Sequence, residues 1–369
     1  MNTAARTLAA MNEPQPVDLR SDTVTQPTEA MYESMRSARV GDDGLDGDPT
    51  ARALEAVAAD ILGKEASLFV PSCTMANLLA ILSQSQRSEQ IVMESSAHIY
   101  TSERGAATFT GLFYLGVPGS RGEMDLGQLE DALAGGGHKL RTSLVTLETS
   151  HNNAGGTALP LTHMGAVAEL ARARGARVHL DGARVFNAAV ALGVTSADLA
   201  RPADTVSLCL SKGLSAPVGA ILAGPRAVID RSRALRRMLG GTQRQTGVIA
   251  AAGLEAIQTM GRRLSDDHRR ASLLSDGINA LGIALVASRP QTNIVQVDVS
   301  ATGRDSAQWT TELERLGVRV RPWGKQRLRA VTHRHIEDAD IARAIEAFRV
   351  AESNLLENPE FDSRRFAGG

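Results

Sequence analysis

The sequence predicts an α/β fold, in which a mostly parallel central sheet carries helices on both faces and a small α+β domain follows at the C-terminal end. Between residues 66 and 239, short apolar stretches alternate with helical patterns of about 10 to 15 residues. This alternation is typical of parallel strands that are buried on both faces. From residue 283 the strands mostly follow one another without a helix between them, which indicates a second kind of domain.

The composition is that of an enzyme-sized soluble protein. The chain has 369 residues, a formal net charge of −1, 43% hydrophobic and 22% charged residues, which suits two or three domains. Near-neutral charge without a basic cluster argues against nucleic acid and against an anionic membrane surface as partners. No apolar run is long enough to span a membrane and the first residues do not resemble a signal peptide, so we expect a cytoplasmic protein.

The N-terminal part is expected to contain three pieces. Residues 1–16 are polar and alanine-rich, and we expect a disordered arm there. The N-terminal segment, 17–50, should hold a short extended stretch, a helix over 28–37 and a loop over 41–50 that is rich in glycine and aspartate. The aspartates of this loop lack the regular spacing and the glutamate of an EF-hand, so no metal site is predicted.

The large domain is expected over residues 51–265, and the small C-terminal domain over 266–350, followed by a tail over 351–369. Strands are expected at 66–71, 90–94, 112–115, 142–147, 176–180, 205–210, 220–223, 284–286, 293–297, 318–321 and 327–331. Helices are expected at 51–62, from about 72 to 82, and at 125–133, 161–174, 185–192, 225–239, 248–260, 266–281, 306–316 and 338–350.

Charged residues follow two of these strands. Lys212 comes just after the apolar run 206–210, between the small residues Ser211 and Gly213, which leave room for a flat ring. Asp181 and Arg184 follow the strand at 176–180. A buried lysine can form a Schiff base with pyridoxal phosphate, and this cofactor also needs an acid beside its ring nitrogen. The two strand ends therefore point to a pyridoxal phosphate site.

Three other short stretches fit the same site. Ser72, Cys73 and Thr74 lie between a strand and a helix, where unpaired backbone N–H groups form a seat for an anion such as phosphate; an equally good interpretation is that a hydroxyl only caps the helix. His98 and His151 each follow a strand end, where open α/β sheets bind ligands. The cysteines, Cys73 among them, have no CxxC spacing for zinc and number only two, so no disulfide framework is expected.

Eight runs carry a specific resemblance. They are 18–25 (DLRSDTVT), 41–43 (GDD), 48–50 (DPT), 97–100 (AHIY), 151–152 (HN), 179–184 (HLDGAR), 209–214 (CLSKGL) and 244–245 (RQ). In these runs the chain resembles the L-threonine aldolases, a low-specificity group of β-eliminating lyases with the fold-type I, aspartate aminotransferase-like fold of pyridoxal phosphate enzymes. The resemblance covers roughly residues 17 to 350, and the runs keep their order, which makes it far more specific than any single motif.

The resemblance implies roles around the cofactor, pyridoxal 5'-phosphate. Lys212 would be the Schiff-base lysine and Asp181 the partner of the pyridine nitrogen. Arg184 would face the ring hydroxyl, and His98 would stack on the ring.

The resemblance also implies roles for the phosphate seat and the substrate. Ser72, Cys73 and Thr74 would seat the phosphate, which Arg244 would reach from the neighbouring subunit. The substrate residues are implied to be Ser21 and Arg329 at the carboxylate, with Arg184 and Leu45 nearby and His151 at the side-chain hydroxyl.

The activity implied is retro-aldol cleavage of β-hydroxy-α-amino acids to glycine and an aldehyde. His151, His98 or a water between them would remove the β-hydroxyl proton, and the Cα–Cβ bond would then break. A neutral histidine suits this step because its ordinary pKa is about 6.5. We also expect a homo-oligomer, a dimer or a tetramer, in which Arg244 and the loop 41–50 complete a neighbouring site.

Three departures leave alternatives open. Leu45 replaces the usual tyrosine of the family, Cys73 replaces a glycine, and Thr242–Gln243 replace the usual pair before Arg244. The same residues therefore also fit a transaldolase or a β-eliminating lyase acting on a bulkier amino acid. A pyridoxal phosphate-binding protein without turnover is a third hypothesis, against which the intact lysine and aspartate argue. A dinucleotide site is not supported, because no GxGxxG follows the first strand.

Overall fold

The computed structural model describes residues 15–357, and the expected arm and tail lie largely outside them. The chain divides into two compact units. The larger unit contains Asp22–Arg269 and Pro290–Ile294, and the smaller unit contains the described residues before Asp22, Arg270–Arg289 and those from Val295 onward. The domain boundaries expected from the sequence, at residues 50, 265 and 350, stay predictions. Among the described residues, no helix has the length and apolar character needed to cross a membrane.

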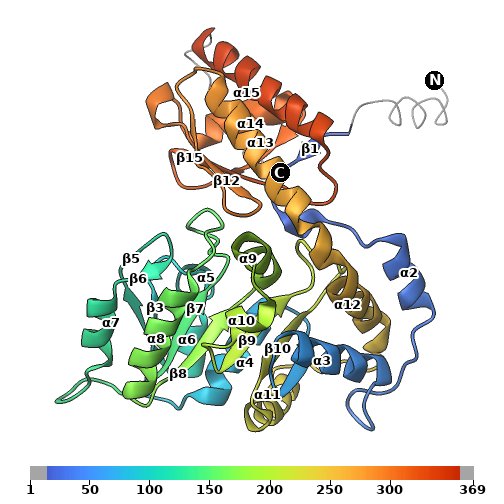
Figure 1. Ribbon diagram of the computed structural model, residues 1–369, viewed down its shortest axis with the longest axis vertical. Coiled ribbons are helices and arrows are strands. Elements are labelled where there is room, and N and C mark those ends of the chain that lie inside the picture. Colours follow the sequence, from blue (N-terminus) through green and yellow to red (C-terminus); the bar gives the residue numbers. More distant parts are fainter. Residues whose placement is uncertain (1–14, 358–369) are drawn as a thin grey trace. The chain divides into compact units, whose positions relative to one another are not determined.

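The larger unit is built on a seven-stranded sheet (Figure 1). Its strands lie in the order β2 (Ala66–Val70), β10 (Ala220–Gly224), β9 (Thr205–Cys209), β8 (Arg177–Asp181), β7 (Thr142–Glu148), β3 (Gln90–Glu94) and β4 (Phe113–Val117). The strands from β9 to β4 are parallel to one another, while β10 runs antiparallel to both of its neighbours. The predicted mostly parallel sheet is therefore confirmed.

Helices follow most of these strands, as the apolar periodicity predicts. They are α2 (Glu29–Arg36), α3 (Pro49–Ile61), α4 (Cys73–Gln84), α5 (His98–Ser102), α6 (Ala106–Thr110), α7 (Leu126–Leu133), α8 (Leu161–Ala173), α9 (Val185–Leu192), α10 (Ser196–Ala200), α11 (Arg226–Met238) and α12 (Gly247–Thr259). The sequence analysis missed α5, α6 and α10, each five residues long, and the hairpin of β5 (Gly119–Ser120) and β6 (Glu123–Met124). Such short elements carry too few residues to show a periodicity.

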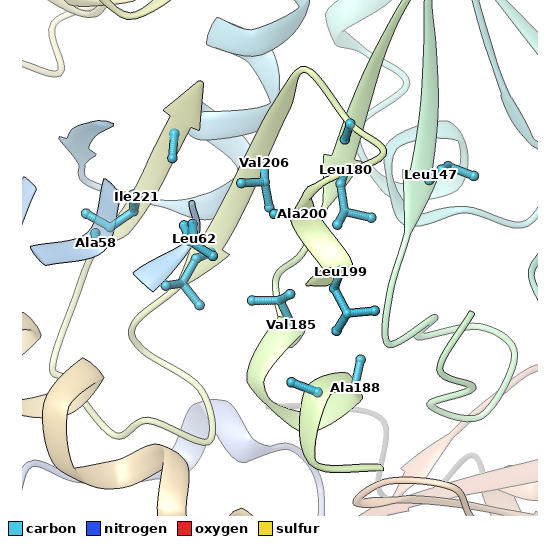
Figure 2. Close-up of a cluster of buried hydrophobic side chains, with 14 of the residues drawn as sticks. Ala58, Leu62, Leu147, Leu180, Val185, Ala188, Leu199, Ala200, Val206 and Ile221 are labelled. Atoms are coloured by element: carbon cyan, nitrogen blue, oxygen red, sulfur yellow. The ribbon is translucent and has the colours of Figure 1, made fainter. Parts of the chain in front are cut away.

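Helices cover both faces of the sheet, so most residues of its inner strands are buried. In β10, Ala220 and Leu222 pack with the helices α4 and α11, whereas Ile221 points into the opposite cluster, which includes residues of α3, α8, α9 and α10. Figure 2 shows part of that cluster, with Val206 and Leu180 from neighbouring strands near Val185 of α9. Because alternate residues of a strand point to opposite faces, burial of both sets requires helices on both sides.

The smaller unit contains a four-stranded sheet of β11 (Val286–Ala287), β12 (Ile294–Asp298), β15 (Arg327–Val331) and β14 (Arg321–Pro322). The strand β1 (Val17–Asp18) pairs in parallel with β13 (Val318–Arg319). The helices α14 (Ser306–Arg315), α15 (Asp338–Glu357) and most of α13 (Leu264–Ala280) complete the unit.

The predicted end of the last helix at residue 350 was wrong. The helix α15 continues to Glu357, because Ala351 and Leu355 are buried in the same apolar cluster as Trp309 and Phe348. Apolar side chains four residues apart lie on one face of a helix, so these two extend its buried face by a further turn.

Candidate active site

The carboxyl ends of three neighbouring parallel strands each carry a buried acid. Glu94 ends β3, Glu148 ends β7 and Asp181 ends β8, and Glu148 and Asp181 are direct partners in the strand register. Lys212 lies three residues beyond the end of β9, the next strand along. Carboxyl ends of parallel strands lie at one edge of a sheet, and this edge is where open α/β folds bind ligands.

Asp181 is only 2% exposed, and its carboxylate is held by hydrogen bonds from three sides. Oδ2 accepts from Nδ2 of Asn77 at 2.9 Å, and Oδ1 accepts from the backbone N–H of Ala183 at 3.1 Å and from the hydroxyl of Ser207 at 3.4 Å. No basic side chain within residues 15–357 forms an ion pair with it. A buried carboxylate without a cationic partner is costly, which makes it a good site for a cationic ligand atom.

Lys212 lies in a tight turn after β9 and is half-buried. Its carbonyl oxygen accepts hydrogen bonds from the Thr25 hydroxyl at 2.9 Å and from the backbone N–H of Ser215 at 2.8 Å. Ser215 adopts a φ of 64°, in the left-handed region, which closes the turn. These contacts fix the backbone of Lys212.

Arg184 forms a buried, bidentate ion pair with Asp22. Its Nε donates to Oδ2 at 2.8 Å and its Nη2 donates to Oδ1 at 2.7 Å. Burial works to raise the pKa of Asp22, but the charge of Arg184, and more weakly that of Lys212, outweighs burial and lowers it. For the Arg184 guanidinium, burial disfavours the charge, yet Asp22 raises its pKa overall. The pair fixes the direction in which Arg184 points.

His98 begins α5, and its imidazole is paired with an acid that the sequence analysis missed. Nδ1 lies 3.0 Å from Oε1 of Glu103, and this hydrogen bond raises the pKa of His98. Glu103 is itself largely buried, which raises its own pKa. Within residues 15–357, no hydrogen-bond partner faces Nε2 of His98. The arrangement leaves one ring nitrogen available to a ligand.

His151 is completely buried, and both of its ring nitrogens are engaged. Nε2 lies 3.2 Å from Oε2 of Glu94, and Nδ1 accepts a hydrogen bond from the backbone N–H of Ala154 at 3.2 Å. Burial disfavours the imidazolium, but Glu148 and Glu94 together raise the pKa of His151. The tautomer that carries its proton on Nε2 satisfies both contacts.

The N-terminus of α4 fits both interpretations of Ser72, Cys73 and Thr74. The Ser72 hydroxyl caps the helix by accepting a hydrogen bond from the backbone N–H of Met75 at 3.2 Å. The first N–H groups of the helix lie at the same place, as an anion seat requires. The Cys73 thiol donates to the Ser207 hydroxyl at 3.6 Å. Cys73 also lies beside Cys209, and the interaction with Cys73 and the charge of Lys212 lower the pKa of Cys209.

Arg244 and Leu45, two of the predicted site residues, are both exposed. The side chain of Arg244 is 70% exposed and lies 3.5 Å from Asp42 of the same chain, and Leu45 is 77% exposed. Leu45 and Arg244 lie on two segments, which are joined by a hydrogen bond from the backbone N–H of Asp43 to the carbonyl oxygen of Arg244 at 3.0 Å and by Asp48, which accepts hydrogen bonds from Gly41 and Gly247. The structure therefore holds the two segments together and leaves these two side chains uncovered.

Ser21 and Arg329 belong to the smaller unit. Both are buried, and Arg329 in β15 stacks its guanidinium over the ring of Trp323 at 4.3 Å. Its Nη2 donates to the carbonyl oxygen of Arg20 at 3.2 Å. Their expected role at a substrate carboxylate stays a prediction.

Asp181, His98 and Glu103 form a group of three side chains that could hold a metal ion. His98, Glu103 and Asp181 offer ligand atoms that lie within 4.8 Å of one another. Asn77 donates to Asp181 and lies 3.3 Å from Glu103, so an amide group already occupies part of the space between the two carboxylates. The expectation that the chain has no metal site stays a prediction.

Comparison with known proteins agrees with this geometry. The sequence family described as beta-eliminating lyase matches residues 18–302. The chain belongs to this family. It is 40% identical over 340 residues to a probable low-specificity L-threonine aldolase 2 of Arabidopsis thaliana, covering 90% of this chain and 96% of that protein.

Two solved structures illustrate the fold of this chain. A threonine aldolase from Leishmania major superposes with a TM-score of 0.79 at 19% identity, covering 91% of this chain and all of that one. An aspartate aminotransferase from Thermus thermophilus superposes with a TM-score of 0.68 at 18% identity, covering 94% and 95%. The expected aspartate aminotransferase-like fold of this beta-eliminating lyase is thus confirmed.

Four polar residues of the larger unit were not predicted from the sequence: Asp22, Asn77, Glu103 and His179. Asp22 and His179 lie inside motifs that were recognised, one and two residues from an assigned residue, so their position within those motifs was an available signal. Asn77 and Glu103 had no comparable signal. They reach Asp181 and His98 only through the folding of α4 and α5.

Proposed function

We propose that this beta-eliminating lyase is a pyridoxal phosphate-dependent aldehyde-lyase that cleaves L-threonine, L-allo-threonine and related β-hydroxy-α-amino acids, reversibly, to glycine and an aldehyde. The observation that carries the proposal is Asp181, a buried carboxylate without an ion pair among the described residues, one strand away from the strand that Lys212 follows. A protonated pyridine nitrogen is the cation that such a carboxylate would hold.

The residues present fit pyridoxal phosphate. Lys212 would hold the cofactor covalently, and Asp181 would pair with its ring nitrogen. Arg184, fixed by its ion pair with Asp22, would face the ring hydroxyl. His98, half-exposed at the start of α5, would stack on the ring.

The phosphate would bind at the N-terminus of α4. Ser72, Cys73 and Thr74 provide the first turn of a twelve-residue helix, whose unpaired N–H groups and dipole favour an anion. When bound, the cofactor supplies an electron sink for the charge that remains on the glycine carbon after the Cα–Cβ bond breaks.

His98 is the better placed of the two histidines to accept the proton of the β-hydroxyl group. Its Nδ1 faces Glu103, so a proton on Nδ1 is held there and Nε2 remains as the basic nitrogen. Both nitrogens of His151 are engaged with Glu94 and Ala154. We therefore assign His151 to the substrate pocket as an orienting residue. His98 would accept the proton, either directly or through a water.

The first experiment is an absorbance spectrum of the purified protein before and after addition of L-threonine, with released acetaldehyde assayed in the same sample. The proposal expects a visible cofactor band that is lost in Lys212→Ala, together with acetaldehyde release. No band in the wild-type protein would refute the cofactor assignment. A band that shifts without acetaldehyde would favour a transaldolase or a lyase for bulkier amino acids, and a band that no β-hydroxy amino acid shifts would favour a protein that binds the cofactor without turnover.

We further propose a homo-oligomer, a dimer or tetramer located in the cytoplasm, whose sites are shared between subunits. The uncovered side chains of Arg244 and Leu45 support this, because an exposed arginine and an exposed leucine on two neighbouring, anchored segments are suited to contact a neighbouring copy. Mixing Lys212→Ala with Arg244→Ala subunits tests it. If the sites are shared, hybrids regain part of the activity that each variant lacks; if each chain builds its own site, mixtures stay inactive.

A further inference from the structure

A row of buried polar side chains leads to Asp181 from within the larger unit. It contains Gln84 and Asn77 of α4, Thr205 at the start of β9 and His179 of β8, all of them buried. The successive distances are 2.9 Å from Gln84 Nε2 to Thr205 Oγ1, 2.9 Å from Thr205 Oγ1 to His179 Nδ1, 3.1 Å from His179 Nε2 to Asn77 Oδ1 and 2.9 Å from Asn77 Nδ2 to Asp181 Oδ2.

The direction of the hydrogen bonds in this row is set from the Asp181 end. A carboxylate only accepts, so Nδ2 of Asn77 donates to Asp181 and Oδ1 of Asn77 faces His179. An amide oxygen also only accepts, so Nε2 of His179 carries a proton. In a neutral imidazole Nδ1 is then the acceptor, and the Thr205 hydroxyl donates to it.

The state of His179 fits this direction. Complete burial lowers the pKa of His179 to about 4, although the charge of Asp181 and a contact with the backbone of Thr205 work in the opposite direction. The imidazole is therefore neutral near pH 7, and Nε2 is its one donor. That donor faces Oδ1 of Asn77.

Asn77 uses all of its hydrogen-bonding capacity at this point. Oδ1 accepts from His179 and from the Ser207 hydroxyl at 2.8 Å, and Nδ2 donates to Asp181 and lies 3.3 Å from Glu103. A rotation of the amide by 180° would place its oxygen against two carboxylates and its nitrogen against two donors. Four contacts therefore select one orientation of the Asn77 amide.

We propose that Asn77 and His179 are positioning residues for the cofactor, and that the tautomer of His179 fixes the Asn77 amide so that its N–H group holds Asp181 in place for the pyridine nitrogen. The inference rests on the proposed cofactor but concerns residues that need not touch it. Asn77 and His179 act through Asp181. The role of Thr205 and Gln84 is to keep the proton of His179 on Nε2.

The test compares two substitutions of His179. His179→Gln places an amide nitrogen near the position of Nε2 and can still donate to Asn77, whereas His179→Leu fills the space without a donor. We expect pyridoxal phosphate to dissociate roughly 10- to 100-fold more readily from His179→Leu and from Asn77→Leu, the range expected for a lost hydrogen bond in a charged network. His179→Gln should recover most of the affinity, measured by titrating the apoprotein with the cofactor and following its absorbance.

A merely structural role for His179 predicts a different pattern. If His179→Gln and His179→Leu bind the cofactor equally weakly, or if both bind it as tightly as the wild type, the inference is wrong. A wild-type protein that binds no cofactor would refute the proposed function instead, and would be recognised before any variant is compared.

A second measurement does not depend on the cofactor or on the variants folding. The ¹⁵N chemical shifts of His179 in the wild-type apoprotein, assigned among its eight histidines, report the tautomer and charge of the ring. We expect a neutral ring protonated on Nε2 from pH 8 down to pH 5. A ring protonated on Nδ1, or one that titrates near its ordinary pKa of 6.5, would overturn the direction of the hydrogen bonds.

Discussion

Replacing Asp22 by asparagine should destabilise the larger unit by about 3 to 5 kcal/mol, the usual effect of removing one member of a buried ion pair. Arg184 is 5% exposed and Asp22 is 0% exposed, and Arg184 donates two hydrogen bonds to Asp22, of 2.8 and 2.7 Å. Asp22→Asn keeps the shape of the side chain and removes its charge. The guanidinium would then remain buried without compensation, which is the source of the large effect.

The pH dependence of the same pair follows from the direction of its pKa shift. Burial opposes ionisation of Asp22, but Arg184 lowers the pKa of Asp22 below its ordinary value of 3.8. A carboxyl group whose pKa is lower in the folded state than in the unfolded state stabilises the fold. This stabilisation is complete at pH values above the unfolded-state pKa and is lost as the pH falls through the folded-state pKa. The difference between the wild type and Asp22→Asn should therefore be constant near neutral pH and shrink only below about pH 3.8.

The assay is urea unfolding of the full chain, followed by circular dichroism. The dependence of the unfolding free energy on urea concentration must be the same for both proteins before their unfolding free energies are compared. Glu33→Gln is the matched control, because Glu33 and Arg36 form an ion pair that is largely exposed, and such pairs contribute about 0 to 1 kcal/mol. If Asp22→Asn lowered the free energy of unfolding by no more than the control does, the reasoning would be refuted, since water would then solvate Arg184 in the folded state.

Three further predictions concern single contacts. Glu103→Gln should lower the pKa of His98, because the Glu103 hydrogen bond is the main cause of its raised value; an NMR titration with an unchanged midpoint would contradict this. Gly122→Ala should destabilise by roughly 1 to 3 kcal/mol, seen as a lower Tm, since φ is +86° and the new Cβ would lie 2.6 Å from the His151 ring. Leu45→Tyr should shift substrate range from bulkier β-hydroxy amino acids toward threonine in a kcat/KM comparison, and equal or better threonine turnover with an unchanged range would count against a role for Leu45.

Gly165 provides the control for Gly122. It lies inside α8, and a Cβ added there would meet no heavy atom within 4 Å. Gly165→Ala should therefore stabilise the protein by about 0.5 to 1 kcal/mol, because alanine is the better helix former. If both substitutions moved Tm in the same direction by similar amounts, the contact between Gly122 and His151 would not be the cause.

Much of the fold could be predicted because its signals are local. Burial on both faces makes the inner strands rich in apolar residues, and β2, β3 and β7 begin at the residues predicted from the sequence. Lys212 and Asp181 could be named because each follows such a strand, and their identity as lysine and aspartate restricts the chemistry. The short helix α5 could not be predicted, and with it the pairing of His98 with Glu103, because five residues show no periodicity.

The sequence by itself determined the order of strands and helices, the lysine and the acid that suit pyridoxal phosphate, and the family. The tertiary structure decided which side chains meet: Arg184 with Asp22, 162 residues apart, and Asn77 with Asp181, 104 residues apart. The physical reason lies in the sheet, whose strand order differs from the chain order and places α4 against β8 and β9. The local sequence sets the spacing of apolar residues along a helix or strand, whereas the contacts of a buried polar group depend on which distant elements pack around it.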